Sequence, residues 1–281
     1  MELLDIERAI IKRYRNKLYG PFIQAIKEYN LVSDGDKIAI CISGGKDSLL
    51  LAKLFQELKK HGKIKFQTEF IVMDPGFNKE NITQLINNCD FLKIPIKIKQ
   101  SKIFSIAGRN SNGKPCFICA RMRRGFLYEF ARENGCNKIA LAHHFNDAIE
   151  TVLLNILYGG IFRTMMPKLK AKNFPGMELI RPMILIREKD IIRYTNYTEI
   201  NPMDCGCEVA SGKISSKRKE IKDLIAEIVK NNKDVENNIY KSAENIYLDR
   251  VLGWKINNVE HNFLDKINVK SDEIRKSNGK K

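Results

Sequence analysis

The stretch CISGGKDSLL (residues 41–50) places adjacent glycines, a lysine and an aspartate between the end of an apolar run and the start of a helical pattern. Glycine lets the backbone turn sharply and approach a ligand closely. The first N–H groups of a helix have no partner within the helix, so they attract anions. The stretch therefore predicts a phosphate-binding turn. A plain strand-to-helix turn capped by serine is the alternative.

This turn differs from the common P-loop, in which four residues separate the first glycine from a Gly-Lys-Ser or Gly-Lys-Thr triplet. Here Gly44 and Gly45 are adjacent, and Asp47 follows Lys46. We expect the Lys46 ammonium group to neutralise phosphate charge. We expect the Asp47 carboxylate to help hold a magnesium ion, because Mg²⁺ prefers oxygen ligands.

Short apolar runs alternate with helical patterns over much of the chain. The strand candidates are KIAICI (37–42), TEFIVMD (68–74), IPIKI (94–98), KIALAH (138–143) and LIRPMIL (179–185). Apolar residues at helical spacing lie between them, at 50–58, 79–92 and 126–130. Strand alternating with helix predicts parallel pairing with right-handed crossovers, hence a doubly wound α/β parallel sheet. Ligands bind such a sheet beyond the C-terminal strand ends, where residues 43–48 lie.

The pattern changes on both sides of this α/β region. Residues 1–34 carry apolar residues at helical spacing among Lys and Arg, which indicates an N-terminal helical segment. Residues 35–200 form the expected phosphate-binding domain. Residues 201–281 contain two amphipathic patterns and a polar, lysine-rich end. We therefore expect a helical C-terminal region that carries the late cysteines.

The chain is strongly basic, with 49 Lys and Arg against 33 Asp and Glu and a formal net charge of +16. Such a field favours a polyanionic partner, of which nucleic acid is the obvious candidate. No apolar run approaches the roughly 18 residues of a membrane-spanning helix, and the N-terminus lacks the apolar core of a signal peptide. We therefore expect a cytoplasmic protein that binds no membrane. A homodimer through the terminal helices is a further hypothesis, without a long heptad repeat to support it.

The chain has seven cysteines. Because we expect the chain to be cytosolic, we do not expect these cysteines to form a disulfide framework. Cys116 and Cys119 form a Cys-x-x-Cys just before a helical pattern, and Cys205 and Cys207 form a second pair. Thiolates at such spacing can converge on one metal. A redox dithiol, a zinc site, an iron–sulfur cluster and simple packing all remain open at this point. The cysteines expected to be small core residues are Cys41, Cys89 and Cys136.

The stretch AHHFNDAIET (142–151) follows the fourth strand candidate, so its polar residues should lie near the first turn. Asp147 could bind magnesium or accept a proton, and His143 could orient phosphate or base. The alternative is that Asn146 or Asp147 merely caps the next helix and that a histidine packs in the core.

A basic helix face follows the first cysteine pair. Arg121 and Arg124 are three residues apart and share this face. They could meet an RNA phosphate or an activated base near the cysteines. A solvated basic face is the alternative.

SGGKDS (43–48) resembles the signature of the PP-loop ATP pyrophosphatases, which cleave ATP between its α- and β-phosphates. The resemblance implies Mg²⁺ and an adenylated intermediate. The ATP-binding residues that it implies are Ser43, Gly44, Gly45, Lys46, Asp47, Ser48, Asp74 and His143. Asp74 is similar to a family position beside the ribose or adenine. The implied catalytic residues are Lys46, Asp47, Asp147 and Arg124.

A larger resemblance, to the tRNA 2-thiocytidine biosynthesis family, covers about residues 25–210. The blocks that carry it are DGDKIAICISGGKDS, CFICARMRRGFLYEFA, KIALAHHFNDAIETVLLNILYGG, IRPMILIREKDI and a late cysteine. It implies that Cys116, Cys119 and Cys207 hold a [4Fe–4S] cluster, with Cys205 as the alternative third ligand. The open iron of such a cluster is expected to carry the transferred sulfur.

The implied reaction is ATP-dependent formation of 2-thiocytidine at position 32 of the tRNA anticodon loop, by adenylation of the base and sulfur transfer. The implied partners are tRNA and a sulfur donor, either a cysteine desulfurase or free sulfide. This chain departs from the family where it has Asn146 in place of a carboxylate, and where only Gly206 separates the late cysteines. The alternatives are a tRNA 2-thiouridine synthetase, a PP-loop enzyme that amidates or ligates a small molecule, and a nucleic-acid-binding module with structural zinc.

Overall fold

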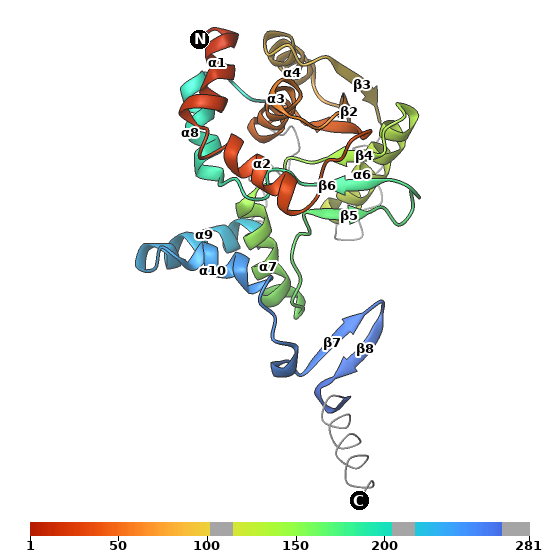
Figure 1. Cartoon of the computed structure of the whole chain (residues 1–281), viewed down its shortest axis with the longest axis vertical. Coiled ribbons are helices and arrows are strands. Elements are labelled where there is room, and N and C mark those ends of the chain that lie inside the picture. The colour runs from red at the N-terminus through yellow and green to blue at the C-terminus, as the bar shows by residue number, and fades with distance from the viewer. Residues whose placement is uncertain (102–114, 204–216, 266–281) are drawn as a thin grey trace, which may run out of the picture.

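The computed structural model describes residues 1–101, 115–203 and 217–265, and within 115–121 it describes the backbone alone. A six-stranded sheet forms the centre, in the order β3-β2-β1-β4-β6-β5 (Figure 1). Its strands are β1 (Lys37–Ile42), β2 (Gln67–Asp74), β3 (Ile96–Gln100), β4 (Lys138–Ala140), β5 (Lys168–Lys170) and β6 (Glu178–Ile180). In this sheet β5 runs antiparallel to β6, and the other neighbours pair in parallel. The predicted doubly wound α/β sheet is confirmed.

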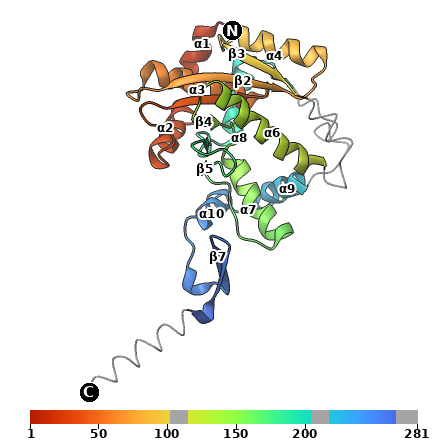
Figure 2. The same ribbon diagram turned by 90° about the vertical axis from the view of Figure 1, so that its right-hand side faces the viewer.

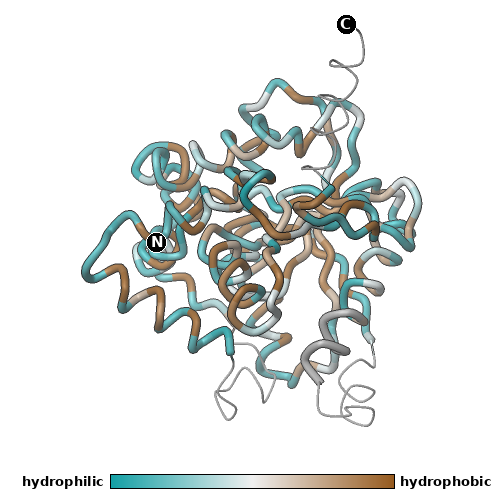
Figure 3. Tube along the Cα trace, turned by 90° about the horizontal axis from the view of Figure 1, so that it is seen from below, coloured by the Kyte–Doolittle hydropathy of each residue, from teal (hydrophilic) through white to brown (hydrophobic). Residues whose placement is uncertain are grey.

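Helices cover both faces of the sheet. They are α1 (Leu3–Arg8), the π-helix η1 (Ala9–Arg13), α2 (Tyr19–Glu28), α3 (Lys46–His61), α4 (Lys79–Phe91), α6 (Pro115–Glu133), α7 (Phe145–Gly159) and α8 (Glu188–Thr198). Ile38 and Ile40 of β1 face the core that α2, α3 and α8 share, whereas Ala39 and Cys41 face α6. A strand buried on both faces is a continuous apolar run, which explains KIAICI. Figure 3 shows hydrophobic segments gathered at the centre of the molecule.

The fifth strand candidate, 179–185, is wrong over most of its length. Only its first two residues belong to a strand, and residues 182–185 form a turn. Met183, Ile184 and Ile186 are buried, so the apolar run reflects burial of an irregular segment. The edge strand β5 was not predicted, because its sequence KLK contains no apolar run.

In the C-terminal region, the structure describes two helices that pack on α7. These are α9 (Lys217–Asn231) and α10 (Val235–Ser242). Ile221 and Ile225 of α9 pack with Phe145 and Ile149 of α7, and the ring of Tyr240 in α10 stacks on Phe145 with 5.1 Å between centroids. The two amphipathic helices expected after residue 200 are therefore present. Among the described residues, no helix has the length and apolar character needed to cross a membrane.

A hairpin that the sequence analysis did not predict follows the short 3₁₀-helix η2 (Leu248–Arg250). Its antiparallel strands are β7 (Gly253–Ile256) and β8 (Val259–Asn262). The hairpin stands apart from the central sheet in both views (Figures 1 and 2). Asn257 and Asn258, with φ of 51° and 67°, form the turn. Asparagine tolerates this left-handed backbone, so the Asn-Asn pair was the overlooked signal.

Candidate functional site

The predicted phosphate-binding turn joins β1 to α3, next to the point where the strand order reverses between β1 and β4. Gly44 has φ of +85°, and its carbonyl accepts the N–H of Met203 at 3.0 Å. Gly45 is the N-cap of α3, and no side chain in the described part of the chain caps this helix. The Ser48 hydroxyl instead braces the turn, because it donates to the Gly45 carbonyl (2.9 Å) and accepts from the Ser43 N–H (3.2 Å). The alternative of a serine-capped helix is therefore wrong.

Gly44→Ala is expected to destabilise the protein by about 2–4 kcal/mol in urea denaturation, because strain and crowding add. A Cβ atom at Gly44 would lie 3.1 Å from Leu85 Cδ1 and 3.1 Å from Met203 Cβ, at a φ that L side chains rarely adopt. Gly35→Ala is the matched control, since Gly35 has φ of +83° and open space around its Cβ position. It should cost only about 1–2 kcal/mol. Equal losses in the two variants would contradict the crowding.

Lys46 and Asp47 begin α3 beside an acidic residue that the sequence analysis missed. Lys46 Nζ lies 3.1 Å from Asp47 Oδ2 and 3.6 Å from Glu188 Oε1. The other carboxylate oxygen of Asp47, Oδ1, is buried and has no hydrogen-bond partner within the described part of the chain. A buried oxygen without a partner is costly, so this atom is a candidate ligand for a cation. The turn thus offers a positive charge for phosphate and an open carboxylate oxygen.

Asp147 forms a capping box with His144, the N-cap of α7. The His144 N–H donates to Asp147 Oδ2 (2.9 Å), and the Asp147 N–H donates to His144 Nδ1 (3.4 Å). Asp147 Oδ1 lies 2.7 Å from Arg218 Nη1. Burial opposes ionisation, but the interactions with His144, His143 and Arg218 outweigh it and lower the pKa of Asp147. Asp147 therefore helps to cap the helix and still carries an ionised carboxylate.

Glu188, the first residue of α8, contacts both the turn that follows β1 and the start of the helix that follows β4. Its N–H donates to Asn146 Oδ1 at 3.0 Å, and its carboxylate pairs with Lys222 Nζ at 2.6 Å as well as with Lys46. Burial opposes the charge, but Lys222 lowers the pKa of Glu188. Sequence reasoning missed Lys222 and Arg218, because two cations four residues apart on an amphipathic helix are typical of a solvated face.

His143 is half-buried and neutral. Its Nδ1 accepts from Arg181 Nε at 3.1 Å, and burial together with the Arg181 charge lowers the pKa of His143 to about 4. The ring proton therefore resides on Nε2, where it can be donated to a ligand. Burial and then repulsion from the charge of Arg124 in α6 lower the pKa of Arg181 to about 10. The side chain of Arg121 lies outside the described residues.

Asp74 lies at the end of β2 and binds its own loop. Asp74 Oδ1 accepts from the N–H groups of Gly76 (2.9 Å) and Phe77 (2.7 Å). This local turn shapes the connection to α4. A role for Asp74 beside ribose or adenine stays a prediction.

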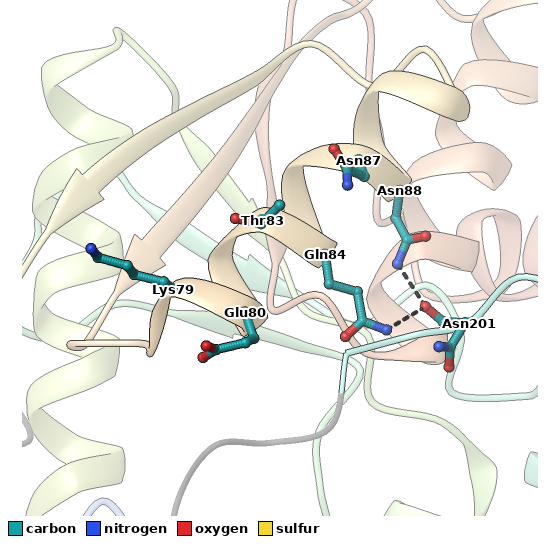
Figure 4. A pocket seen from close by; sticks show the side chains of 7 residues that line it. All are labelled: Lys79, Glu80, Thr83, Gln84, Asn87, Asn88 and Asn201. Atoms are coloured by element: carbon teal, nitrogen blue, oxygen red, sulfur yellow. Dashed lines mark hydrogen bonds between the residues drawn. The ribbon is translucent and has the colours of Figure 1, made fainter.

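A depression of about 570 Å³ follows the outer face of α4 (Figure 4). It is lined by Lys79, Glu80, Thr83, Gln84, Asn87, Asn88 and Asn201. The side chains of Gln84 and Asn88 donate to the Asn201 carbonyl at 3.1 and 2.8 Å. These bonds tie α4 to the segment whose Met203 contacts the turn. None of the predicted site residues whose side chains the structure describes lines the depression, so we assign it a structural role.

Glu150, one turn after Asp147, is expected to make stability depend on pH. Burial raises the pKa of Glu150 to about 7, and Arg218, 3.7 Å away, only partly offsets this. Because this pKa lies above the ordinary 4.5, the folded state loses stability as pH rises from 4.5 through 7. Glu150→Gln should therefore gain about 2 kcal/mol relative to the wild type between about pH 5 and pH 8 in urea denaturation. A difference that does not change with pH would contradict the assignment.

Three cysteines lie in the core, as predicted. Cys41, Cys89 and Cys136 are all buried. Burial raises the pKa of Cys89 to about 12 and that of Cys136 to about 11, and it raises the pKa of Cys41 further. These thiols are therefore protonated packing groups, unsuited to bind metal.

The candidate cluster ligands are described only in part. The backbone of Cys116 and Cys119 lies at the start of α6, one helical turn apart. Arg124 follows Cys119 by five residues, about 8 Å along the helix axis. The first cysteine pair is therefore carried by the same helix as Arg124. Cys205 and Cys207 lie outside the described residues.

Residues 15–204 match the family of PP-loop domains. The tRNA-cytidine(32) 2-sulfurtransferase 1 of Francisella tularensis subsp. novicida (strain U112) is 32% identical over 277 residues, which cover 97% of this chain and 99% of that protein. The tRNA-cytidine(32) 2-sulfurtransferase of Geobacter metallireducens is 32% identical over 250 residues, 86% of this chain and 95% of that protein.

Among solved structures, this chain is similar to the U34-tRNA thiolase NcsA from Methanococcus maripaludis with its [4Fe-4S] cluster. The TM-score is 0.65 at 23% identity, over 80% of this chain and 76% of that one. This likeness establishes the fold, and the sequence relatives establish the family. The chain belongs to the PP-loop family and, within it, to the family of the tRNA-cytidine(32) 2-sulfurtransferases.

Proposed function

We propose that the chain is an ATP-dependent tRNA sulfurtransferase that forms 2-thiocytidine at position 32 of the anticodon loop. The observation that carries the proposal is the relationship, over 97% of the chain, to a tRNA-cytidine(32) 2-sulfurtransferase. Charged side chains gather around Lys46 and Glu188, beside the N-terminus of α7. They support the proposal, because charged groups stabilise the transfer of a phosphoryl group from ATP.

The first step activates the base. The C2 oxygen of cytidine attacks the α-phosphorus of ATP, an O–P bond forms, and pyrophosphate leaves. The N–H groups at the start of α3 bind phosphate oxygens, since none of the described side chains caps that helix. Lys46 stabilises the negative charge that develops on the leaving pyrophosphate. His143 donates its Nε2 proton to a phosphate or base oxygen.

Asp47 and Asp147 would hold the magnesium ion that accompanies ATP. Asp47 has a buried oxygen without a partner among the described residues, and Asp147 is kept ionised, so both fit a hard cation. Bound there, Mg²⁺ would neutralise charge on the phosphates. Glu188 adds a carboxylate next to Asn146, the position at which the resemblance leads one to expect an acid.

Sulfur transfer completes the reaction. A C–S bond forms at C2, the bond from C2 to the adenylated oxygen breaks, and AMP leaves with that oxygen. We assign Cys116, Cys119 and Cys207 as ligands of a [4Fe–4S] cluster, with Cys205 as the alternative third ligand. Thiolates are the donors that such a cluster takes, and when bound it supplies an iron with an open position for the sulfur. Arg124, on the same helix as the first pair, binds tRNA phosphate or the activated base.

The remaining partners follow from charge and accessibility. An unpaired anticodon-loop base exposes its edge, and the net charge of +16 attracts the tRNA backbone. A cysteine desulfurase or free sulfide supplies the sulfur in the cytoplasm. We further propose that the chain has three regions, residues 1–34, 35–200 and 201–281. We also propose that it forms a homodimer through the terminal helices.

The test is nucleoside mass spectrometry after reaction in vitro. Anaerobically purified protein is incubated with ATP, Mg²⁺, sulfide and tRNA that has either cytidine or uridine at position 32. We expect 2-thiocytidine at that position, only when ATP is present. Formation of 2-thiouridine instead would favour the uridine enzyme. Pyrophosphate release without any thiolation of tRNA would favour an enzyme that acts on a small molecule.

A further inference from the structure

The C-terminal helix α9 brings two cations to the ATP side of the sheet. Arg218 Nη1 lies 2.7 Å from Asp147 Oδ1, and Lys222 Nζ lies 2.6 Å from Glu188 Oε2. The two cations are four residues apart and therefore neighbours on one face of the helix. The apolar face of α9 packs on α7, which fixes where these side chains start. Arg218 and Lys222 thus contact residues of the proposed site that lie more than 30 positions away in the sequence.

Lys222 and Lys46 share one carboxylate. Both ammonium nitrogens lie within 4 Å of a Glu188 oxygen, at 2.6 and 3.6 Å. With Arg218 on Asp147, three cations surround two acidic residues, Asp147 at the start of α7 and Glu188 at the start of α8. The side chains of Arg218 and Lys222 are 44% and 53% exposed, so each can turn toward a ligand while α9 stays in place.

We propose that Arg218 and Lys222 bind the β- and γ-phosphates of ATP, the part that leaves as pyrophosphate. The inference rests on the proposed function, because it requires ATP to bind at the turn of residues 43–48. Carboxylates that bind Mg²⁺ release their ion-pair partners, and phosphate oxygens accept those partners. The Arg218 guanidinium can hold two phosphate oxygens at once, and Lys222 adds a charge on the side of Lys46.

If these ion pairs had a purely structural role, removing their charges would lower the stability of the protein and leave its affinity for the triphosphate unchanged. Partly exposed ion pairs contribute little to stability. Ile221 and Ile225, which are 1% and 5% exposed, anchor α9 on α7 without the two cations. Variants that lose only the charges should therefore fold and unfold thermally like the wild type, while their affinity for the triphosphate changes.

The experiment is equilibrium titration with a non-hydrolysable ATP analogue and, separately, with AMP. Arg218→Gln and Lys222→Gln should each weaken binding of the analogue about tenfold. AMP affinity should not change, because AMP lacks the β- and γ-phosphates. Arg218→Lys keeps the charge but not the planar fork, so its loss should be smaller. Lys230→Gln is the matched control on α9, because Lys230 pairs with Glu227 outside this cluster.

Equal losses of analogue and AMP affinity would overturn the inference, since they would indicate a general distortion of the site. Unchanged analogue affinity in both glutamine variants would overturn it as well, and would leave the proposed function intact if the wild type binds both nucleotides. A wild type that binds neither nucleotide would overturn the proposed function together with the inference. Should Arg218→Gln not fold, Arg218→Lys and Lys222→Gln decide the outcome.

Discussion

Cys116→Ala is expected to yield a folded protein that binds no iron–sulfur cluster and forms no 2-thiocytidine. The proposed cluster has three thiolate ligands, and loss of one leaves two, too few to retain it. Cys116 lies at the start of α6, far along that helix from its packed part around Tyr128 and Phe130, so the fold should survive. The measurement is iron and acid-labile sulfide content with visible absorption after anaerobic purification, followed by nucleoside mass spectrometry.

Cys136→Ala is the matched control, because it makes the same change at a buried cysteine with a raised pKa. This variant should keep its iron. Cys205→Ala and Cys207→Ala, made separately, should differ, and the one that loses iron names the third ligand. Iron and activity retained in Cys116→Ala would remove this cysteine from the site. A colourless wild type with stoichiometric zinc would replace the cluster by a structural metal and end the sulfur-transfer mechanism.

Lys46→Met is expected to lower kcat/KM for pyrophosphate release by roughly 10²–10³-fold, the usual effect of removing one group that stabilises transition-state charge. Methionine keeps the apolar stem of the side chain but removes the ammonium that contacts Asp47 and Glu188. The leaving pyrophosphate then loses a direct counter-charge. Steady-state kinetics with pyrophosphate as the measured product, in the presence of tRNA, provides the check.

Lys59→Met serves as the control for charge loss on the same helix. Lys59 is exposed in the last turn of α3, on the end away from the phosphate-binding turn. Its kcat/KM should match the wild type. If Lys46→Met kept full kcat/KM and lost only thermal stability, Lys46 would be a structural residue and the phosphate-binding turn would need another cation.

Elements with a local physical cause were predicted closely. β1 has its predicted bounds, 37–42, because an apolar run buried on both faces ends at a glycine turn. The pattern at 79–92 corresponds to α4, which begins after Asn78 because that side chain accepts the N–H of Asn81. Each of these signals is contained within a few consecutive residues, so the sequence alone suffices to place it.

Elements without such a cause were missed or misassigned. The turn at 182–185 is apolar because it packs into the core, and apolar residues cannot reveal whether a short buried segment is extended. β5 exists because residues 168–170 lie along β6, which supplies its hydrogen bonds. Both outcomes depend on neighbours that are distant in the chain.

By itself the sequence determined the phosphate-binding turn, the parallel sheet and the positions of the candidate ligands, because local spacing encodes strands, helices and turns. The tertiary structure alone decided which charges meet there. Glu188, Arg218 and Lys222 look like ordinary surface residues in sequence, since a polar helix face has the same pattern whether it meets water or a carboxylate. The packing of α9 on α7 removes that ambiguity, because it holds both cations against Asp147 and Glu188.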